Sequence, residues 1–449
     1  MSEVKVNKIS PRTACGTVTM GDSGDTIALG CGASQTGFGR TGTVDWDTSN
    51  IKTATFAGVN GNGYFANTTG GAFNLTLPAS PTAGDIIAVK DYANTFDTNN
   101  LTVDRNGKPL DGETHNLVLD VEGQSVSLVY VDGTKGWLVI QDSDTTNVPK
   151  YVSATGGCIS FSGDYKIHKY TGSGCFSVNC AGNAAGSNVV DYLVVAGGGS
   201  GALDNGAGGG AGGFRESTPS PAAWTGSPIT KSGGGLPVSA ISYPVIIGGA
   251  STAAPNTPPT TTPVGSEGGF PGNPSSALCI TSAGGGGASH GGTSGCVSVM
   301  SGGSGGGAGQ NSTEPAKGIG NTPPVSPAQG KDGGYQPNPA GGGGGGGGAT
   351  ACGPGCTSPG GTNGGAGATT CISGGPVAYA GGGGGGGGQP GATPGGAGGT
   401  GGGGAGGPNA DAGTAGTINT GGGGGGAGQG GPLGASGGSG IVILRYKYQ

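Results

Sequence analysis

Side chains that could perform hydrolysis are few in this sequence, and they are far apart. Cleavage of a polysaccharide by the common route needs two carboxyl groups about 5–10 Å apart. The carboxyl-bearing residues after position 200 are Asp204, Glu216, Glu267, Glu314, Asp332 and Asp411. Long uncharged stretches separate them, so we expect each in an isolated loop. The sequence therefore predicts a protein that is not an enzyme and has no catalytic residues.

Metal and cofactor sites are not indicated either. The histidines are His115, His168 and His290. The segment "CGPGC" places Cys352 and Cys356 four residues apart, but no second pair of ligands follows at the spacing of a zinc site. Unpaired thiols are the default for the ten cysteines. Loop disulfides between Cys352 and Cys356, or between Cys175 and Cys180, are the alternative in an oxidising medium. Glycine is too frequent for a phosphate-loop pattern to carry information, and we expect no cofactor.

Composition first suggests disorder and then argues against it. The 449 residues include 115 glycines and 29 prolines, a share typical of low-complexity chains. Disordered chains are usually rich in charge, whereas only 9% of these residues are charged, and Asp411 is the one Asp, Glu, Lys or Arg from Gly333 to Leu444. Collagen is excluded because the glycines are contiguous and do not recur at every third position.

Charge and hydropathy limit the partners and the location. The net charge is −6 without a basic block, so we expect no nucleic acid as a partner. The N-terminal stretch "MSEVKVNKISPRT" has no apolar core of the signal-peptide type, and no run of about 18 apolar residues could span a bilayer. Synthesis in a cytoplasm is the expectation.

Three regions follow from the pattern of β-prone and turn residues, and the predicted class is all-β with polyglycine II. Residues 1–50 form a short β-rich segment that cannot bury a core alone. Residues 51–145 alternate apolar and polar positions and predict a small β-sandwich or knob, with the clearest hairpin at "SVSLVYVDGTKGWLVIQD". Residues 152–449 predict a β-sheet domain whose strands at 157–197 and 441–448 flank a glycine-rich insertion, 197–440.

Glycine runs of similar length inside this insertion predict a bundle of rods. They lie near 206–213, 301–309, 341–348, 381–388, 395–407 and 421–430. A polyproline-II-type helix has about three residues per turn, a rise of about 3.1 Å per residue and no internal hydrogen bonds. When every residue is glycine, such helices can approach closely and satisfy their N–H and C=O groups on one another. A charged side chain inside the bundle would be desolvated, which explains the missing charges.

Several stretches carry a resemblance. They are "VNKISPRTACGTVTMGDSGDTIAL", "ANTTGGAFNLTLPASPTAGDIIAVKDYANTFDTNNLTVDRNG", "EGQSVSLVYVDGTKGW", "SGDYKIHKYTGSGCFSV", "VVDYLVVAGGG" and "GGSGIVILRYKYQ". Together they resemble tail fibre proteins of tailed bacteriophages, particularly marine phages that infect cyanobacteria. The pair "DYLVVAGGG" and "GSGIVILRY" is the most specific part, and the glycine-rich region is similar to the polyglycine-II sandwich of T-even phage adhesins.

The resemblance implies a function, an assembly and a set of partners. The N-terminal segment would attach the fibre to the phage tail or baseplate, directly or through an adaptor protein. The middle region would form trimeric shaft or knob structure, and the glycine-rich domain would be the distal receptor-binding head. The expected protein is a virion component, made in the host cytoplasm. It is expected to be a homotrimer that binds a host glycan, lipopolysaccharide or outer-membrane protein.

Loops of the glycine-rich region are the predicted recognition elements, because glycine rods offer no side chains and rigid scaffolds carry function on their loops. Segments 349–363 and 408–413 are predicted to share the outward end, with "YQPNPA" and "QPGATP" as the rival set at the other end. Candidate residues that could bond sugar hydroxyls are Thr357, Ser358, Asn363, Asn409 and Asp411.

Three other interpretations stay open. A non-adhesive structural virion protein fits the same composition. An ice-binding or cell-wall protein would show a flat, regular threonine array, whereas the threonines here cluster irregularly, as in "TPPTTTP". An unstructured glycine-rich filler would leave the closing "IVILRYKYQ" strand unexplained.

Overall fold

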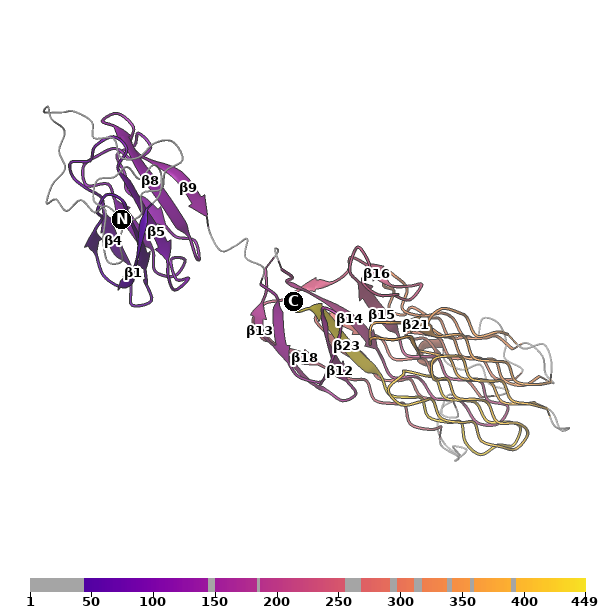
Figure 1. The fold of residues 1–449 in the computed structure, drawn as a ribbon. Coiled ribbons are helices and arrows are strands. Elements are labelled where there is room, and N and C mark those ends of the chain that lie inside the picture. The colour runs from indigo at the N-terminus through magenta and orange to yellow at the C-terminus, as the bar shows by residue number, and fades with distance from the viewer. Residues whose placement is uncertain are drawn as a thin grey trace, which may run out of the picture. The chain divides into compact units, whose positions relative to one another are not determined.

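The computed structural model describes residues 44–143, 150–183, 186–254, 268–290, 297–310, 317–336, 341–355, 359–388 and 393–449. Contacts divide the chain into two units, Met1–Thr146 and Asn147–Gln449. Both are built from β-strands (Figure 1), and the one helix in the described ranges is the four-residue α1 (Val297–Met300). The predicted all-β class is confirmed. Most of the predicted N-terminal segment, 1–43, lies outside the described residues.

Unit one consists of two sheets around one core. The five-stranded sheet has the order β1 (Asp45–Lys52), β3 (Asn62–Ala66), β5 (Ile86–Asp91), β8 (Ser125–Asp132), β9 (Gly136–Ser143). The four-stranded sheet has the order β2 (Phe56–Ala57), β4 (Phe73–Thr76), β6 (Leu101–Asp104), β7 (Leu117–Leu119). The predicted hairpin is confirmed as the antiparallel pair β8–β9. Strands β1, β3 and β5 are parallel, as are β2, β4 and β6, so the first six strands alternate between the two sheets.

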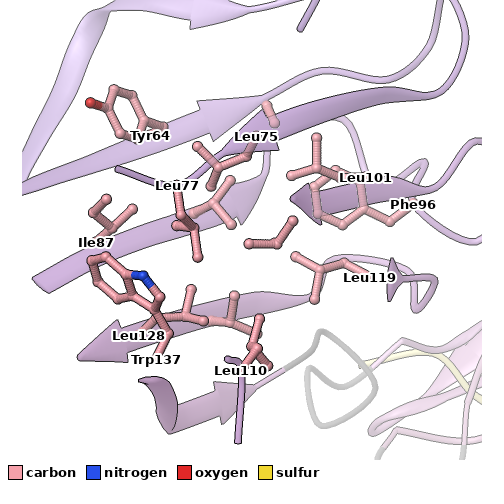
Figure 2. Packing of buried hydrophobic residues seen from close by; sticks show 14 of the residues in the cluster. Tyr64, Leu75, Leu77, Ile87, Phe96, Leu101, Leu110, Leu119, Leu128 and Trp137 are labelled. Carbon is pink, nitrogen blue, oxygen red and sulfur yellow. The ribbon is translucent and has the colours of Figure 1, made fainter. Parts of the chain in front are cut away.

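Large apolar side chains fill the space between these sheets. Figure 2 shows leucines of both sheets, such as Leu75 and Leu128, pointing toward one another, with the Trp137 ring at one side of the cluster. Strands β4 and β6 alternate buried and more exposed positions, with Leu75 and Leu101 fully buried, as expected for strands with one face on a core. The core of unit one is therefore made of side chains.

The base of unit two is a second pair of sheets. The larger sheet has the order β11 (Cys158–Ser162), β12 (Tyr165–Tyr170), β23 (Ile441–Lys447), β14 (Val189–Val195), β15 (Phe214–Thr218), β16 (Lys231–Ser232), and β17 (Leu236–Pro237) pairs with β14. The smaller sheet has the order β10 (Val152–Thr155), β13 (Gly174–Ala181), β18 (Ser242–Val245). One apolar cluster combines buried side chains of both sheets, including Phe176, Tyr192 and Leu444.

The last strand of the chain closes this sheet. Strand β23 lies between β12 and β14 and is antiparallel to both, with Ile441 opposite Val195. The predicted insertion, 197–440, begins at the end of β14 and ends at the start of β23, which are adjacent positions in the sheet (Figure 1). This confirms the expectation that one sheet holds both ends of the insertion. The insertion is not one excursion, because the chain returns to the two base sheets as β15 to β18 between these points. Within the insertion are two small hairpins, β19 (Ser275–Ala277) with β20 (Ile280–Ser282) and β21 (Ala368–Thr370) with β22 (Val377–Tyr379).

Backbone hydrogen bonds join the glycine-rich segments to one another. The N–H groups of residues 382–387 turn to three neighbouring segments in a repeating order, each at 2.9 Å. Their acceptors are, in sequence, the carbonyls of Gly365, Gly209 and Gly404, and then those of Thr362, Gly206 and Gly407. A period of three is what three residues per turn would produce. The pattern favours polyglycine II, and that conformation stays a prediction.

Close approach explains why these positions are glycine. A Cβ atom added to Gly383 would lie 2.1 Å from the carbonyl oxygen of Gly424, and one added to Gly386 would lie 1.9 Å from that of Ala427. Neither contact is compatible with van der Waals radii, and the atoms in the way belong to backbone. Glycine in the run 381–388 is thus a packing requirement.

Candidate functional site

Described turns at the end of the glycine-rich segments remote from the sheet form the candidate site. After β14 the chain runs outward, turns at 203–205 and returns along 206–213 to β15. The turns at 408–411 and 429–433 meet it there, since Gly428 N–H donates to Asp411 O at 3.0 Å and Gly430 N–H donates to Asp204 Oδ1 at 2.8 Å. We call residues 203–205, 290, 310, 408–411 and 429–433 the tip. It lies at the end of the glycine-rich segments opposite the sheet (Figure 1).

Polar side chains of the tip bond to one another across separate segments. Asn205 Nδ2 donates to Gln310 Oε1 at 2.7 Å, and His290 Nε2 lies 3.7 Å from Asp204 Oδ2. Asp204, Asn205 and Asn409 have φ values of 46°, 50° and 43°. Asn and Asp tolerate this left-handed region better than other residues with a Cβ. The turn geometry therefore selects amide and carboxylate side chains. Of the three, Asn409 is exposed and Asp204 is half-buried, whereas Asn205 is buried and holds the turn through Gln310.

Predicted receptor-binding residues fall into three groups. Asn409 and Asp411 are exposed and lie in the tip. Asn363 lies in an extended segment, where its Oδ1 accepts the Ala397 N–H at 2.8 Å, so it joins two segments. Thr357 and Ser358 lie outside the described residues. A receptor contact of any of the five stays a prediction.

The expected division of the loops between two ends is wrong. Gly388 N–H donates to Pro359 O at 2.7 Å, and Gly361 N–H donates to Pro394 O at 3.0 Å. Segment 349–363 and the flanks of "QPGATP", which were predicted at opposite ends, are therefore neighbours at one end. The reason is that 349–363 is not a single loop. Gly353 N–H bonds to Asp332 O, which makes 350–355 a further packed segment and changes the count of reversals.

Cysteine geometry corrects one of the proposed disulfides. Cys175 and Cys180 lie on the same strand, β13, five residues apart. An extended strand separates their Cα atoms by about 16 Å, whereas a disulfide needs about 4.4–6.8 Å. That pairing is therefore wrong. Cys352 is exposed and Cys356 lies outside the described residues, so their pairing stays a prediction.

Comparison with known proteins assigns most of the second unit to a protein family. The sequence pattern of a family described as a glycine-rich domain matches residues 171–447, well over half of the chain. The chain belongs to this glycine-rich domain family. The match confirms the expectation of a glycine-rich C-terminal domain. No curated protein matches the chain.

Several tip residues of the glycine-rich domain were not predicted from the sequence. Asp204 was considered only as an isolated acid, and Asn205, His290 and Gln310 were not singled out. The dipeptide Asn205-Gly206 inside a glycine run was a turn signal that could have located the first reversal. His290 and Gln310 carry no comparable signal, because their place depends on which segments become neighbours.

Two acids of the glycine-rich domain lie in the sheet at its base. Asp191 is buried on β14, and burial raises its pKa to about 6 although the Ser217 hydroxyl donates to it at 2.7 Å. Glu216 was expected in a loop, but it lies on β15 with its side chain buried, where it accepts the Ser227 N–H at 2.9 Å and the Thr370 hydroxyl. Burial raises the pKa of Glu216 as well. Their partners are protein groups that hold turns to the sheet.

A buried arginine lies on the same face of this sheet, directly opposite Asp191 in the pairing of β23 with β14. Arg445 on β23 donates to Ile372 O at 3.1 Å, and its guanidinium carbon lies 4.1 Å from the centre of the Trp224 ring. Burial lowers its pKa. Trp224 and Tyr379 both lie in an apolar cluster with Leu193 and Ile443 on this face. Arg445 therefore joins the sheet to the turn after β21.

Metal and membrane features can be stated for the described ranges. In those ranges no cluster of three or more His, Cys, Asp or Glu side chains could hold a metal ion. Among the helices of the same residues, none is long and apolar enough to cross a membrane.

Proposed function

We propose that this chain is a bacteriophage tail fibre protein that binds the surface of the host cell through the tip. Three things support the proposal: the resemblance of several stretches to tail fibres, the glycine-rich domain, and the convergence of polar turns at one end of that domain. The observation that carries it is the tip itself, where turns distant in sequence are joined through Gly430 to Asp204 and through Gly428 to Asp411, with the side chains of Asn409 and Asp411 exposed.

The physical argument concerns the separation of scaffold and surface. Glycine-rich segments bond through backbone groups and leave no side chains for recognition. Exposed turn positions such as Asp411 can therefore differ in sequence without disturbing the packing beneath them, whereas Asp204 and Asn205 bond neighbouring segments together. Amide and carboxylate groups suit sugar hydroxyls, each of which is both donor and acceptor. The receptor class we propose is a host surface glycan or lipopolysaccharide, with an outer-membrane protein as the alternative.

The remaining parts of the proposal concern assembly. Residues 1–50 would attach the fibre to the tail or baseplate, or to an adaptor protein, and the chain would act in the virion as a homotrimer. Light scattering of the purified chain tests the trimer separately from binding.

No catalytic step is proposed, because the buried acids Asp191 and Glu216 are bonded to protein groups.

Cell binding tests the tip. The full chain, fluorescently labelled, is applied to a panel of candidate host cells and to their isolated lipopolysaccharide, and is also used to compete with phage adsorption. A triple variant, Asp204→Ala with Asn409→Gly and Asp411→Ala, removes polar groups of the tip and is expected to bind at least about tenfold more weakly. The control is Asp120→Ala, an exposed acid of unit one.

Both outcomes are informative. Loss of binding in the triple variant alone supports recognition by the tip. A correctly folded parent chain that binds no cell surface would overturn the proposal and favour a non-adhesive structural role in the virion.

A further inference from the structure

A groove of about 640 Å³ opens at the end of unit two opposite the tip. Its lining comes from both sheets of the base: Lys150, Tyr151, Val152, Ser153, Phe161, Lys166, Cys180 and Tyr448. Strand β23 starts beside the glycine-rich segments and ends near Tyr448, which places the groove at the far end of the sheet. The groove and the tip share no residue.

Aromatic side chains form the apolar part of this groove. Phe161, on the edge strand β11, is 60% exposed. Its ring centre lies 5.3 Å from that of Tyr448, and the ring planes are tilted by 56°. Tyr151, directly before β10 of the other sheet, is partly exposed. Exposed rings are costly to leave in water and mark a contact surface when they gather in a concave place.

Positive charge surrounds the rings. Lys150 and Lys166 line the groove, and Lys447 Nζ lies 5.7 Å from the centre of the Tyr151 ring. None of the described residues that line the groove is acidic, although the chain as a whole has a net charge of −6. The groove is thus complementary in charge to an anion.

The edge of β10 beside the groove is closed to an added peptide strand. Ala154 N–H donates to Tyr446 Oη at 3.1 Å, and Lys166 Nζ donates to Ala154 O at 3.0 Å. A peptide that paired with this edge would have to break both bonds. Stacking on the rings and contact with the ammonium groups remain, and they suit a cyclic molecule with one apolar face and a carboxylate.

We infer that this groove binds an acidic sugar unit of a polysaccharide, such as a hexuronate. The C–H face of the pyranose ring packs on Phe161 and Tyr448, and the carboxylate accepts a hydrogen bond from Lys166 Nζ. An ammonium group has three hydrogens, so Lys166 can keep its bond to Ala154 and still donate to the sugar. The site does not depend on the tip, and either could fail without the other.

Cys180 provides the measurement. It is an exposed thiol in the groove lining, and Cys279, an exposed thiol elsewhere in unit two, is an internal reference. The full chain is alkylated with iodoacetamide in the presence of an oligogalacturonate, and the labelling rate of each cysteine is read by peptide mass spectrometry. We expect Cys180 to be protected and Cys279 to react as before. A neutral malto-oligosaccharide of equal length should protect at least about fivefold less well at the same concentration.

Variants separate the two components of the site. Lys166→Gln and Phe161→Ala should each weaken protection about fivefold or more. The control is Lys169→Gln, because Lys169 is exposed on the same strand but faces the opposite side of the sheet, and it should change protection less than about twofold.

Three results would overturn the inference. One is the absence of protection at about 10 mM oligogalacturonate, because a specific site would have a dissociation constant below that concentration. Another is equal protection by the neutral sugar, which would remove the role of charge. The third is protection by a pentaglutamate peptide but not by oligogalacturonate, which would identify an acidic protein segment as the occupant.

Discussion

The two units are packed and stabilised by opposite means. Unit one buries side chains such as Leu75 and Trp137 between two sheets, and its backbone bonds lie within those sheets. The glycine-rich region removes side chains, and its segments bond to three neighbours at a time. The stability of unit one depends on side chains that fill its core, whereas that of the glycine-rich region depends on the absence of Cβ atoms between its backbones.

This difference determines which positions tolerate change. A side-chain core accepts substitutions that conserve volume, because the surrounding groups can adjust their rotamers. Packed backbones have no rotamers to adjust, so each interior glycine position is restrictive. The turns of the tip are free of that restriction, and this separation is what makes the region suitable as a scaffold for a variable surface.

The largest effect is expected from a side chain inside the glycine-rich packing. Gly383→Val would place a Cβ 2.1 Å from the Gly424 oxygen, with two further methyl groups beyond it. Domains are stable by only about 5–15 kcal/mol, and displaced neighbours would lose their own hydrogen bonds. We expect unit two to lose its cooperative unfolding transition in calorimetry, while unit one keeps its own.

The matched control is Gly375→Ala. Gly375 lies in the turn between β21 and β22, and a Cβ there would meet nothing within 4 Å. This variant should unfold like the parent chain. A Gly383→Val protein with a normal transition would show that the segments move apart easily, and the comparison between the two units would fail.

A smaller effect is expected from the opposite change in unit one. Leu75→Ala deletes a fully buried side chain and should lower the free energy of unfolding by about 2–5 kcal/mol. Leu75→Met conserves volume and should cost less than about 1.5 kcal/mol. The calorimetric transition of unit one measures both. Equal costs for the two variants would argue against a core that depends on filled volume.

An effect of similar or smaller size is expected from pH at the base of unit two. Burial raises the pKa of Asp191 from 3.8 to about 6, so the folded state binds this proton more tightly than the unfolded chain. Its stabilisation is present below the unfolded value and is lost as pH rises toward 6. Relative to the parent, Asp191→Asn should therefore gain up to about 2–3 kcal/mol in the free energy of unfolding of unit two between pH 3.5 and pH 7.

Asparagine keeps an oxygen to accept the Ser217 hydroxyl, so the comparison isolates the charge. Asp164→Asn, an exposed position, is the control and should follow the parent at every pH. Parallel curves for the parent and Asp191→Asn would mean that Asp191 stays ionised in the folded state.

Local patterns predicted part of this architecture. The β8–β9 hairpin and the closing strand β23 were predicted correctly, because alternation and turn residues act over a few positions. The parallel order of β1, β3 and β5 was not predicted, since alternation is the same in parallel and antiparallel strands. The common end of the loops was also missed, because segment 350–355 is too poor in glycine runs to be recognised as packed.

The smallest effect on stability is expected at the tip, where the effect on binding should be large. Asp411→Ala removes an exposed side chain whose backbone oxygen, which the substitution keeps, accepts the Gly428 N–H. Asn409→Gly places glycine at a φ of 43°, which glycine adopts readily. Each should change the free energy of unfolding by less than about 0.5 kcal/mol. If the tip binds the receptor, cell binding should fall although the melting curve does not move. A loss of stability that accompanied the loss of binding would show that the turns support the packing, and scaffold and surface would no longer be separable.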